Sequence, residues 1–266
     1  MSFTEFAWTM ARRFPVALSF IGFAVWATIL GLLFDLPLAT YFKRHEATEF
    51  VGFFRAITDL GKPDLWFPVL SFIVFMALTA WYMDFREAIK ERIGRVITAC
   101  VFVFLSVALS GLAVNIVKLL AGRHRPRELF DAHLSGFTPL AFDVHLDSFP
   151  SGHAQMIFAL AGALVIIAPR FDHFYVLVAI AVALSRVVTS VHFLSDTLIG
   201  AWVGIAAPVI LHRYFFQPRG ILVRVQICYR HPGLLRRIRD GLDRKFAYTP
   251  PPESPPEDAK DPDDER

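Results

Sequence analysis

Six apolar runs constrain this chain more than any other feature of its sequence, because each is long enough to cross a lipid bilayer. They lie near residues 15–34, 66–83, 96–120, 153–169, 174–191 and 194–212. Inside a bilayer every backbone amide and carbonyl must be bonded within the protein, which a helix of about 20 apolar residues achieves. The runs therefore predict an all-α, polytopic membrane protein built as a six-transmembrane-helix bundle.

The composition agrees with membrane spans and argues against two other classes of protein. Hydrophobic residues make up 55% of the 266, and the mean hydropathy of +0.48 is too high for an ordinary soluble domain. The net charge is only +3 and the basic residues are scattered, so no nucleic-acid partner is expected. Cys100 lies in an apolar run and Cys228 follows the last one, so we interpret both as packing residues rather than a disulfide.

The first run follows Arg12 and Arg13, an arrangement that also occurs in secretory and twin-arginine signals. The run 15–34 is long for a signal core and has the length of a membrane span. We therefore favour an uncleaved first helix over a signal that is removed.

Lys and Arg predict which loops remain in the cytoplasm, because cytoplasmic loops carry the excess of positive charge. The side that holds the N-terminus has the denser set, namely Arg12, Arg13, Arg86, Lys90, Arg92, Arg95, Arg170 and the cluster from Arg213 onward. Both termini are therefore predicted to be cytoplasmic, in a multi-pass protein of the cytoplasmic (inner) membrane. The loop 121–152 and the turn near His192 would then lie on the outer, periplasmic side.

Two regions outside the spans have a composition of their own. From Phe50 to Leu60 apolar residues recur among charges, which predicts a short helix that either lies in the membrane interface or packs over the bundle as a cap. After the spans, residues 221–247 read as a cytoplasmic basic amphipathic segment. Residues 248–266, rich in Pro and acidic side chains, are predicted to be disordered. The transmembrane domain is thus assigned to residues 1–220, with a motif core at 118–196.

Three polar clusters would meet at the outer ends of the third to sixth helices. They are Lys118 to Pro126, Phe149 to His153, and Ser185 to Asp196. Ser151 would cap the fourth helix, whose exposed N–H groups offer a site for an anion. Snorkelling would explain Lys118 and simple capping would explain Ser151, but neither explains His153.

The third cluster places an imidazole near a carboxylate. On an ideal helix Ser185, Thr189, His192 and Asp196 would share one face, so His192 and Asp196 could touch. A carboxylate that holds one imidazole nitrogen fixes the tautomer and directs the other nitrogen outward. Arg186 would lie about 100° from that face, a gap its long side chain can cross. The alternative is a buried ion pair that ties two helices together.

Taken together, the clusters supply what is needed to bind and attack a phosphate group. Lys118, Arg125 and Arg186 can neutralise its oxygens, and Arg offers a planar fork of donors. Phosphoryl transfer depends mostly on positioning and on charge stabilisation, so such a cradle would be most of the catalyst.

The ordered pattern formed by these residues resembles the complete three-part signature of the type 2 phosphatidic acid phosphatase family. The pattern is Lys118-x6-Arg125-Pro126, then Pro150-Ser151-Gly152-His153, then Ser185-Arg186-x5-His192-x3-Asp196. That superfamily includes integral-membrane bacterial lipid phosphatases, bacterial acid phosphatases and vanadium haloperoxidases. All motif positions match in order, the helical layout extends the likeness to about residue 213, and the tail after 220 is not covered.

The resemblance implies a lipid phosphate phosphatase with its active site at the surface of the bundle. His192 would attack phosphorus to form a phosphohistidine, Asp196 would orient His192, and His153 would protonate the leaving oxygen and then activate water. The residues implied in binding the phosphoryl oxygens are Lys118, Arg125, Arg186, Ser151 and Gly152. Neither a cofactor nor a metal ion is expected.

The implied substrate is a lipid whose phosphate lies at headgroup depth while its chains remain in the bilayer. Candidates are undecaprenyl diphosphate, lipid A phosphate, phosphatidylglycerol phosphate and phosphatidate. The signature recognises the phosphate and not the tail, so it does not choose among them. The preference for a monophosphate or a diphosphate and the oligomeric state stay open.

Three other functions fit the pattern less well. A metal-dependent hydrolase would draw its ligands from the 121–149 loop, whose spacing matches no site we recognise. Those possible ligands are His124, Asp131, His133, Asp143, His145 and Asp147. A non-catalytic membrane transporter or anion-binding protein would be expected to show repeats and helices broken at the bilayer centre. A haloperoxidase would use vanadate in the same cradle, but those relatives are not built of membrane spans.

Overall fold

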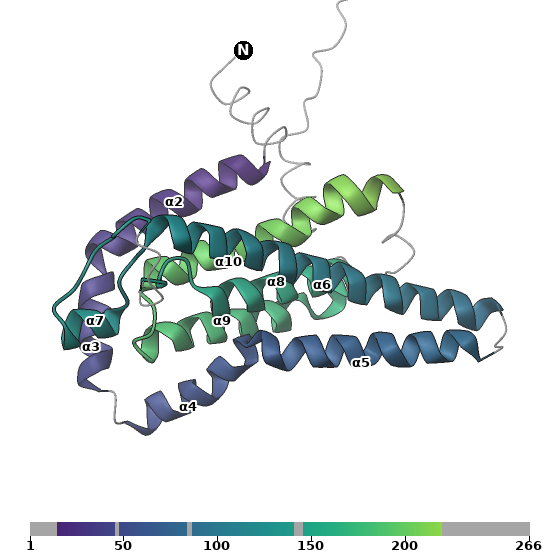
Figure 1. The fold of residues 1–266 in the computed structure, drawn as a ribbon, viewed down its shortest axis with the longest axis horizontal. Coiled ribbons are helices and arrows are strands. Elements are labelled where there is room, and N and C mark those ends of the chain that lie inside the picture. The colour runs from purple at the N-terminus through teal and green to yellow at the C-terminus, as the bar shows by residue number, and fades with distance from the viewer. Residues whose placement is uncertain (1–14, 46–47, 84–86, 141–145, 220–266) are drawn as a thin grey trace, which may run out of the picture.

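The computed structural model describes residues 15–45, 48–83, 87–140 and 146–219, which form an all-helical bundle (Figure 1). The helices are α2 (Pro15–Leu33), α3 (Asp35–Arg44), α4 (Glu49–Thr58), α5 (Pro63–Tyr82), α6 (Glu87–Ala121), α7 (Pro126–Asp131), α8 (Gly152–Ile167), α9 (Asp172–Val188) and α10 (Leu194–Leu211). A 3₁₀ turn, η1 (Asp59–Gly61), joins α4 to α5. The predicted all-α polytopic fold is therefore confirmed.

Among the described residues, five segments are long and apolar enough to cross a membrane, and they coincide with five of the six predicted runs. They are Val16–Leu33, Pro63–Tyr82, Glu87–Ala121, Pro169–Val188 and Leu194–Arg219. The fourth run forms α8, which has only 16 residues and is shorter than the roughly 20 that a full span requires. A sixth crossing thus stays a prediction. At 35 residues α6 is about 50 Å long, so it extends beyond the hydrocarbon core.

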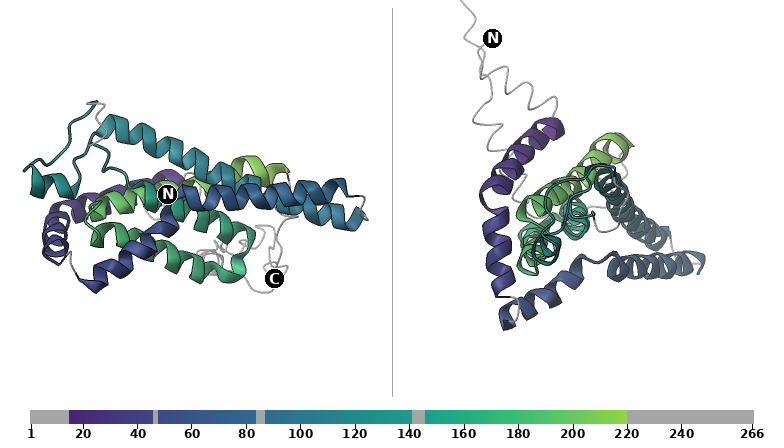
Figure 2. Two further views of the ribbon diagram at one scale, coloured as in Figure 1. Left: turned by 60° about the horizontal axis from the view of Figure 1, so that its bottom comes forward. Right: turned by 60° about the vertical axis from the view of Figure 1, so that its left-hand side comes forward.

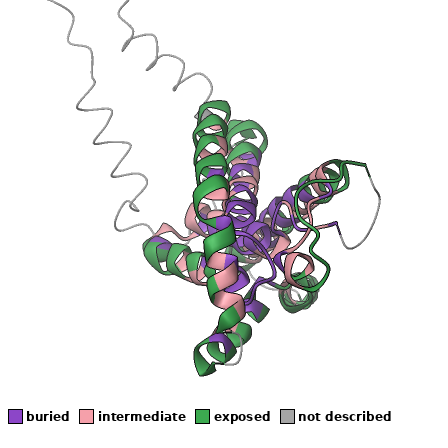
Figure 3. Ribbon diagram, turned by 90° about the vertical axis from the view of Figure 1, so that its left-hand side faces the viewer, coloured by how far each residue is buried: buried purple, intermediate pink, exposed green. Residues whose placement is uncertain are grey.

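The buried core lies among α6, α8, α9 and α10. Its members include Phe102, Val103, Ile157, Leu160, Ala179, Val182 and Leu211. In the right-hand view of Figure 2, α2 and α3 run along one side of these central helices, and α5 lies on another side, where it packs against α6. Figure 3 looks onto the end of the bundle that lies at the left of Figure 1, where buried segments gather in the middle and exposed segments outside. No residue of α5 is buried, as expected of a helix whose surroundings are lipid.

Two glycines let α10 approach α8 closely. A Cβ atom at Gly200 would lie 2.4 Å from the carbonyl oxygen of Ser151, and one at Gly204 would lie 2.5 Å from the carbonyl oxygen of Gln155. Small residues four positions apart allow the backbones of two membrane helices to touch. This contact fixes the beginning of α8, with Ser151 and His153, against the beginning of α10.

The segment between the first two spans forms the predicted short helix, α4. Val51 and Thr58 are buried, whereas Phe50 and Phe53 are exposed. α4 packs against α9, so the segment covers the bundle, and its aromatic side chains point outward. The packing of α4 over the bundle is therefore observed, and its position relative to the membrane interface stays a prediction.

Several predictions concern residues outside the described ranges. These residues are the segments 221–247 and 248–266, the N-terminal pair Arg12 and Arg13, Arg86, and the loop residues 141–145.

Candidate active site

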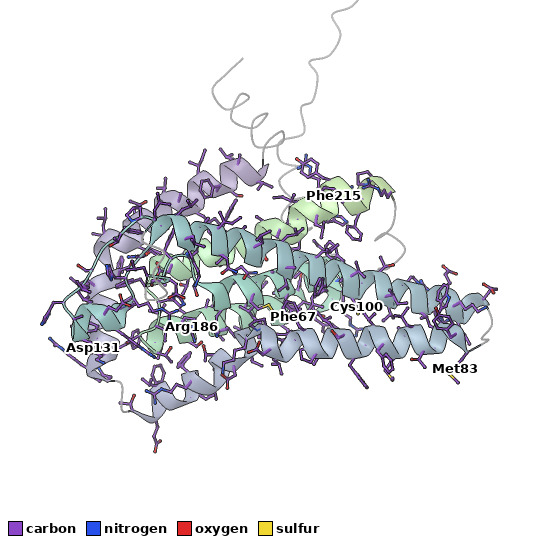
Figure 4. All side chains as sticks on the ribbon, in the orientation of Figure 1. Phe67, Met83, Cys100, Asp131, Arg186 and Phe215 are labelled. Atoms are coloured by element: carbon purple, nitrogen blue, oxygen red, sulfur yellow. The ribbon has the colours of Figure 1, made fainter. Side chains whose placement is uncertain are left out.

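The three polar clusters come together at the end of the bundle opposite the α5–α6 turn. Figure 4 labels Arg186 toward this end and Met83, which follows α5, at the other. The amide of Ser151 donates to the carbonyl oxygen of Asp196 at 3.0 Å, and the amide of Ser148 donates to that of Arg123 at 3.1 Å. The loop before α8 is therefore tied both to α10 and to the segment after α6.

The third cluster is not one continuous helix, so the ideal-helix prediction was wrong. Residues 189–193 form a turn between α9 and α10, in which Ser190 has a φ of 54°. The amides of Val191 and His192 donate to the carbonyl oxygen of Arg186 at 3.1 and 3.2 Å. The turn closes back on the end of α9 and joins the fifth predicted run to the sixth.

His192 is buried, and one of its ring nitrogens is fixed by the main chain. Its Nδ1 atom lies 2.8 Å from the carbonyl oxygen of Ser148. A carbonyl oxygen can only accept, so Nδ1 must carry the proton and donate it. In the neutral imidazole the lone pair is then on Nε2, the nitrogen that a nucleophile at this position would use.

The sequence spacing suggested that Asp196 holds His192 directly, but the structure shows no hydrogen bond between them. The Oδ2 atom of Asp196 lies 3.9 Å from His192 Nδ1, beyond hydrogen-bond distance. The same oxygen accepts from Ser148 Oγ at 2.7 Å and from the amide of Phe193 at 2.9 Å, and Oδ1 accepts from Arg123 at 2.5 Å. Ser148 therefore bridges the two residues, since its hydroxyl contacts Asp196 and its carbonyl contacts His192.

Lys118 and Arg125 are brought together by a carboxylate that the sequence argument had treated as a loop residue. Lys118 Nζ donates to the carbonyl oxygen of Asp147 at 2.8 Å and lies 3.6 Å from its Oδ2 atom. Arg125 Nε donates to Asp147 Oδ1 at 2.6 Å. The two cations are thus held beside the loop that precedes α8.

Arg186 and His153 have buried nitrogens without a protein partner. Arg186 Nη1 donates to Thr58 Oγ1 of α4 at 2.7 Å. Arg186 Nε, His153 Nε2 and Ser190 Oγ are buried and have no hydrogen-bond partner within the described ranges. Buried polar atoms are nearly always paired, so these three mark where a polar ligand would bind.

The 3₁₀ turn η1 closes this region from the side of α4. A Cβ atom at Gly61 would lie 2.8 Å from Val182 Cγ1 and 3.1 Å from His153 Cβ. Only a residue without a side chain fits there, so the turn packs directly against His153.

Ser151 and Gly152 occupy the first turn of α8, as predicted. Ser151 is fully buried, and its Oγ atom accepts from the amide of Ala154 at 3.5 Å, a long capping bond. A Cβ atom at Gly152 would meet nothing within 4 Å, so its backbone borders open space. Their part in binding phosphoryl oxygens stays a prediction.

Burial and nearby positive charge keep His192 neutral. Burial lowers the pKa of the imidazole well below its ordinary value. Positive charge from Arg186, Lys118 and Arg125 lowers this pKa further, and the hydrogen bond from Nδ1 opposes the shift only in part. A neutral imidazole retains the Nε2 lone pair, which a nucleophile requires.

Asp147 remains ionised because the neighbouring cations stabilise its negative charge. Burial alone would raise its pKa, but the bonds and charges of Arg125 and Lys118 outweigh burial and hold the pKa below its ordinary value. Asp147 therefore anchors both cations while it partly neutralises them.

Of the loop residues considered as metal ligands, Asp143 and His145 lie outside the described ranges, and the other four do not gather. His124 Nδ1 lies 2.8 Å from Glu128, and Asp147 is held by Arg125 and Lys118. Within residues 15–45, 48–83, 87–140 and 146–219 no three His, Cys, Asp or Glu side chains are arranged to hold a metal ion.

An apolar cavity of about 850 Å³ lies between α2, α6 and α10. Arg123, Pro150 and Ser195 contribute to its wall, and the remainder is mostly apolar. None of the eight predicted site residues lines it. The cavity therefore adjoins the site without containing its reactive groups.

The PAP2 superfamily model matches residues 99–219, a range that contains all three clusters. Over this range the chain resembles the PAP2 superfamily. The match begins in α6 and extends past α10, so it covers the helices that build the site.

Two lipid A 1-phosphatases are similar to this chain. The one from Rhizobium etli is 28% identical over 187 residues, which is 68% of this chain and 79% of that protein. The one from Rhizobium johnstonii is 28% identical over 193 residues, 70% of this chain and 78% of that protein. The crystal structure of the first transmembrane PAP2 type phosphatidylglycerolphosphate phosphatase from Bacillus subtilis aligns with a TM-score of 0.53 at 20% identity, over 81% of this chain and 100% of that one. This last similarity concerns the fold.

Sequence reasoning missed several residues that hold the site together. Ser148 positions His192, Asp147 holds Lys118 and Arg125, Thr58 binds Arg186, and Arg123 binds Asp196. Asp147 and Ser148 immediately precede the second motif, which is a signal that could have drawn attention to them. Thr58 carries no such signal, because only the packing of α4 on α9 brings it to Arg186.

Proposed function

We propose that this protein is an integral-membrane lipid phosphatase of the PAP2 type that acts through a phosphohistidine, with lipid A 1-phosphate as its first candidate substrate. The observation that carries the proposal is His192, a buried, neutral imidazole anchored through Nδ1 at the end of the bundle where three cations gather. The choice of lipid is supported by the two relatives, both of them lipid A 1-phosphatases. Undecaprenyl diphosphate, phosphatidylglycerol phosphate and phosphatidate remain the other candidates.

In the first step His192 Nε2 attacks phosphorus. The N–P bond forms while the P–O bond to the lipid breaks, and His153 gives a proton to the leaving oxygen. The ring becomes positively charged when Nε2 is phosphorylated. Its Nδ1–H bond to Ser148 and the Asp196 carboxylate, 3.9 Å from Nδ1, stabilise that charge.

In the second step water replaces the histidine. His153 removes a proton from the water, the water oxygen attacks phosphorus, and the N–P bond breaks with its electron pair returning to Nε2. Lys118, Arg125 and Arg186 neutralise the phosphoryl oxygens throughout, and the unpartnered Nε of Arg186 is one available donor. Inorganic phosphate then leaves.

The proposal places the site on the outer side of the cytoplasmic membrane, with both termini inside. Lys90 and Arg95 lie in the first turns of α6, at the end where Figure 4 labels Met83, opposite Arg186. Positive charge at that end supports its cytoplasmic placement. A lipid with its phosphate at headgroup depth would then reach the site from the outer leaflet.

Phosphate release by the purified protein in detergent tests the proposal. Each of the four candidate lipids would be supplied with and without EDTA, beside His192→Ala and a matched control, His173→Ala. His173 is an exposed histidine at the beginning of α9. We expect EDTA-resistant release from lipid A 1-phosphate that is lost in His192→Ala and kept in His173→Ala. Release that persists in His192→Ala would remove it as the nucleophile, and loss with EDTA that a divalent metal restores would overturn the metal-free mechanism.

A further inference from the structure

A buried chain of charges lies behind His192 and links α3 to α10. Arg123 Nη1 donates to Asp196 Oδ1 at 2.5 Å, and Arg123 Nη2 donates to Asp35 Oδ2 at 2.9 Å. The side chains of Asp35 and Asp196 are 4% and 0% exposed, and that of Arg123 is 13% exposed. One guanidinium is thus shared between two carboxylates that are almost wholly removed from solvent.

Ser195 completes this cluster at the beginning of α10. Its amide donates to Asp35 Oδ1 at 3.0 Å, its hydroxyl donates to Asp35 Oδ2, and Arg123 Nη1 donates to that hydroxyl at 2.8 Å. The guanidinium carbon of Arg123 lies 4.4 Å from the centre of the Phe193 ring. Asp35 and Arg123 therefore hold three residues of the turn and of α10, namely Phe193, Ser195 and Asp196.

Neither Asp35 nor Arg123 is part of the motif pattern that indicated a phosphatase. Arg123 occupies one of the six unspecified positions between Lys118 and Arg125. Asp35 lies outside residues 99–219, the range that the PAP2 superfamily model matches. A carboxylate directly after a membrane span is costly to bury, and its retention is usually functional.

The hydrogen bonds form a continuous path from this cluster to the imidazole. Arg123 holds Asp196, Asp196 accepts from Ser148 Oγ at 2.7 Å, and Ser148 accepts from His192 Nδ1 at 2.8 Å. Movement of Asp196 would therefore move the carbonyl that directs His192. Both Nη atoms of Arg123 are already engaged, so the guanidinium is directed at carboxylates and not toward a phosphate.

We propose that Asp35 and Arg123 are positioning residues, which hold Asp196 and Ser148 so that His192 points its Nε2 atom at phosphorus. This inference rests on the proposed function, in which His192 is the nucleophile. Displacement of a nucleophile by a fraction of an ångström slows the chemical step while the binding of phosphate is kept. Asp35 and Arg123 should therefore influence kcat and leave KM nearly unchanged.

The test compares Asp35→Asn, Arg123→Gln, Arg123→Lys and the double variant Asp35→Asn/Arg123→Gln with the unmodified protein. The assay measures kcat and KM for phosphate release and the inhibition constant of inorganic phosphate, after size-exclusion chromatography has confirmed folded protein. Asp131→Asn and Arg44→Gln serve as matched controls, because both residues are exposed. Figure 4 labels Asp131 at the outer end of α7.

We expect kcat to fall about tenfold in Asp35→Asn and about a hundredfold in Arg123→Gln, with KM and the phosphate inhibition constant within about twofold. Arg123→Lys, which keeps the charge, should recover part of the lost kcat. The kcat of the double variant should fall by less than the product of the two single losses. Arg123→Gln leaves the Asp35 carboxylate buried and unpaired, and Asp35→Asn removes that charge. Asp35→Asn is isosteric and keeps the test valid if Arg123→Gln does not fold.

Two outcomes would overturn the inference. Unchanged kcat in folded Asp35→Asn and Arg123→Lys would show that the cluster does not act on His192. A rise in KM and in the phosphate inhibition constant at constant kcat would instead make Arg123 a ligand of the substrate. Failure of the proposed function is read separately, since it would appear as equal activity in His192→Ala and the unmodified protein.

Discussion

His192 Nδ1 lies 2.8 Å from the main-chain carbonyl oxygen of Ser148, whereas the Asp196 carboxylate lies 3.9 Å from the same nitrogen. The tautomer of His192 is therefore fixed by the backbone of the loop that precedes α8. A carboxylate acts on the imidazole through that loop and through its charge. This arrangement separates two roles, orientation and charge stabilisation, which one hydrogen bond would otherwise combine.

Replacement of Ser148 by alanine should separate these roles. The substitution keeps the carbonyl that accepts from His192 and removes only the hydroxyl that donates to Asp196 at 2.7 Å. We expect kcat to fall about tenfold, which is about 1.4 kcal/mol in the barrier, with KM nearly unchanged. Steady-state kinetics on the lipid substrate measures both. A loss as complete as that of His192→Ala would instead make the hydroxyl indispensable for holding the loop.

The residue types of the site could be predicted from the sequence, but their contacts could not. The spacing of His192 and Asp196 suggested contact on one helix face, and the turn at residues 189–193 breaks that helix. The turn depends on the positive φ of Ser190 and on bonds back to Arg186, which no periodicity encodes. The charge cluster around Arg123 joins residues far apart in the chain, so only the folded structure, in which Asp35 bonds to Arg123 and Ser195, reveals it.

Removal of a neighbouring cation should shift the pH dependence of the reaction. Positive charge at Arg125 helps to hold the pKa of His192 below its ordinary value, so the neutral form persists into acid solution. In Arg125→Gln less positive charge repels the protonated imidazole. The Asp147 carboxylate also loses the cation that partly neutralised it. Both changes favour the protonated form, so the pKa of His192 rises. The acid limb of kcat/KM should therefore move to higher pH, as a full pH profile of each protein would measure.

Arg44→Gln is the control for this shift. Arg44 is an exposed arginine at the end of α3, and its charge does not contribute to the lowered pKa of His192. Its acid limb should coincide with that of the unmodified protein. Ionisation of the substrate phosphate affects all proteins equally, so it cancels in the comparison. An acid limb of Arg125→Gln that is unmoved, or moved to lower pH, would contradict the role assigned to His192.

The fold was predictable as far as composition determines it. Apolar runs placed the spans, because backbone in lipid must be helical, and the recurrence of apolar residues from Phe50 to Leu60 predicted the short helix α4. The run at residues 153–169 gave no warning that α8 is short and mostly buried. A buried helix and a spanning helix are both uniformly apolar. The folded structure distinguishes them, because it shows the length of each helix and what surrounds it.

Close packing of α8 on α10 should make Gly200 intolerant of substitution. A Cβ atom there would lie 2.4 Å from the carbonyl oxygen of Ser151, so Gly200→Ala must push the two helices apart. We expect a destabilisation of about 1–3 kcal/mol, seen as a lower thermal unfolding midpoint in detergent, and a parallel loss of activity. Gly22→Ala is the matched control, because a Cβ atom at Gly22 in α2 would meet nothing within 4 Å. Equal midpoints in the two variants would contradict this account of the helix contact.

The proposed orientation can be tested by cysteine labelling. In a Cys228→Ser background the buried Cys100 should stay unlabelled, and single cysteines at Asp131 and Glu87 would report on opposite ends of the bundle. Both residues are exposed, so reactivity depends on access from either side of the membrane. A membrane-impermeant maleimide added to intact spheroplasts should label Asp131→Cys and spare Glu87→Cys, which should react only after lysis. The reverse pattern would place the site in the cytoplasm and would limit the enzyme to lipids of the inner leaflet, because phosphates on the outer side could not reach His192.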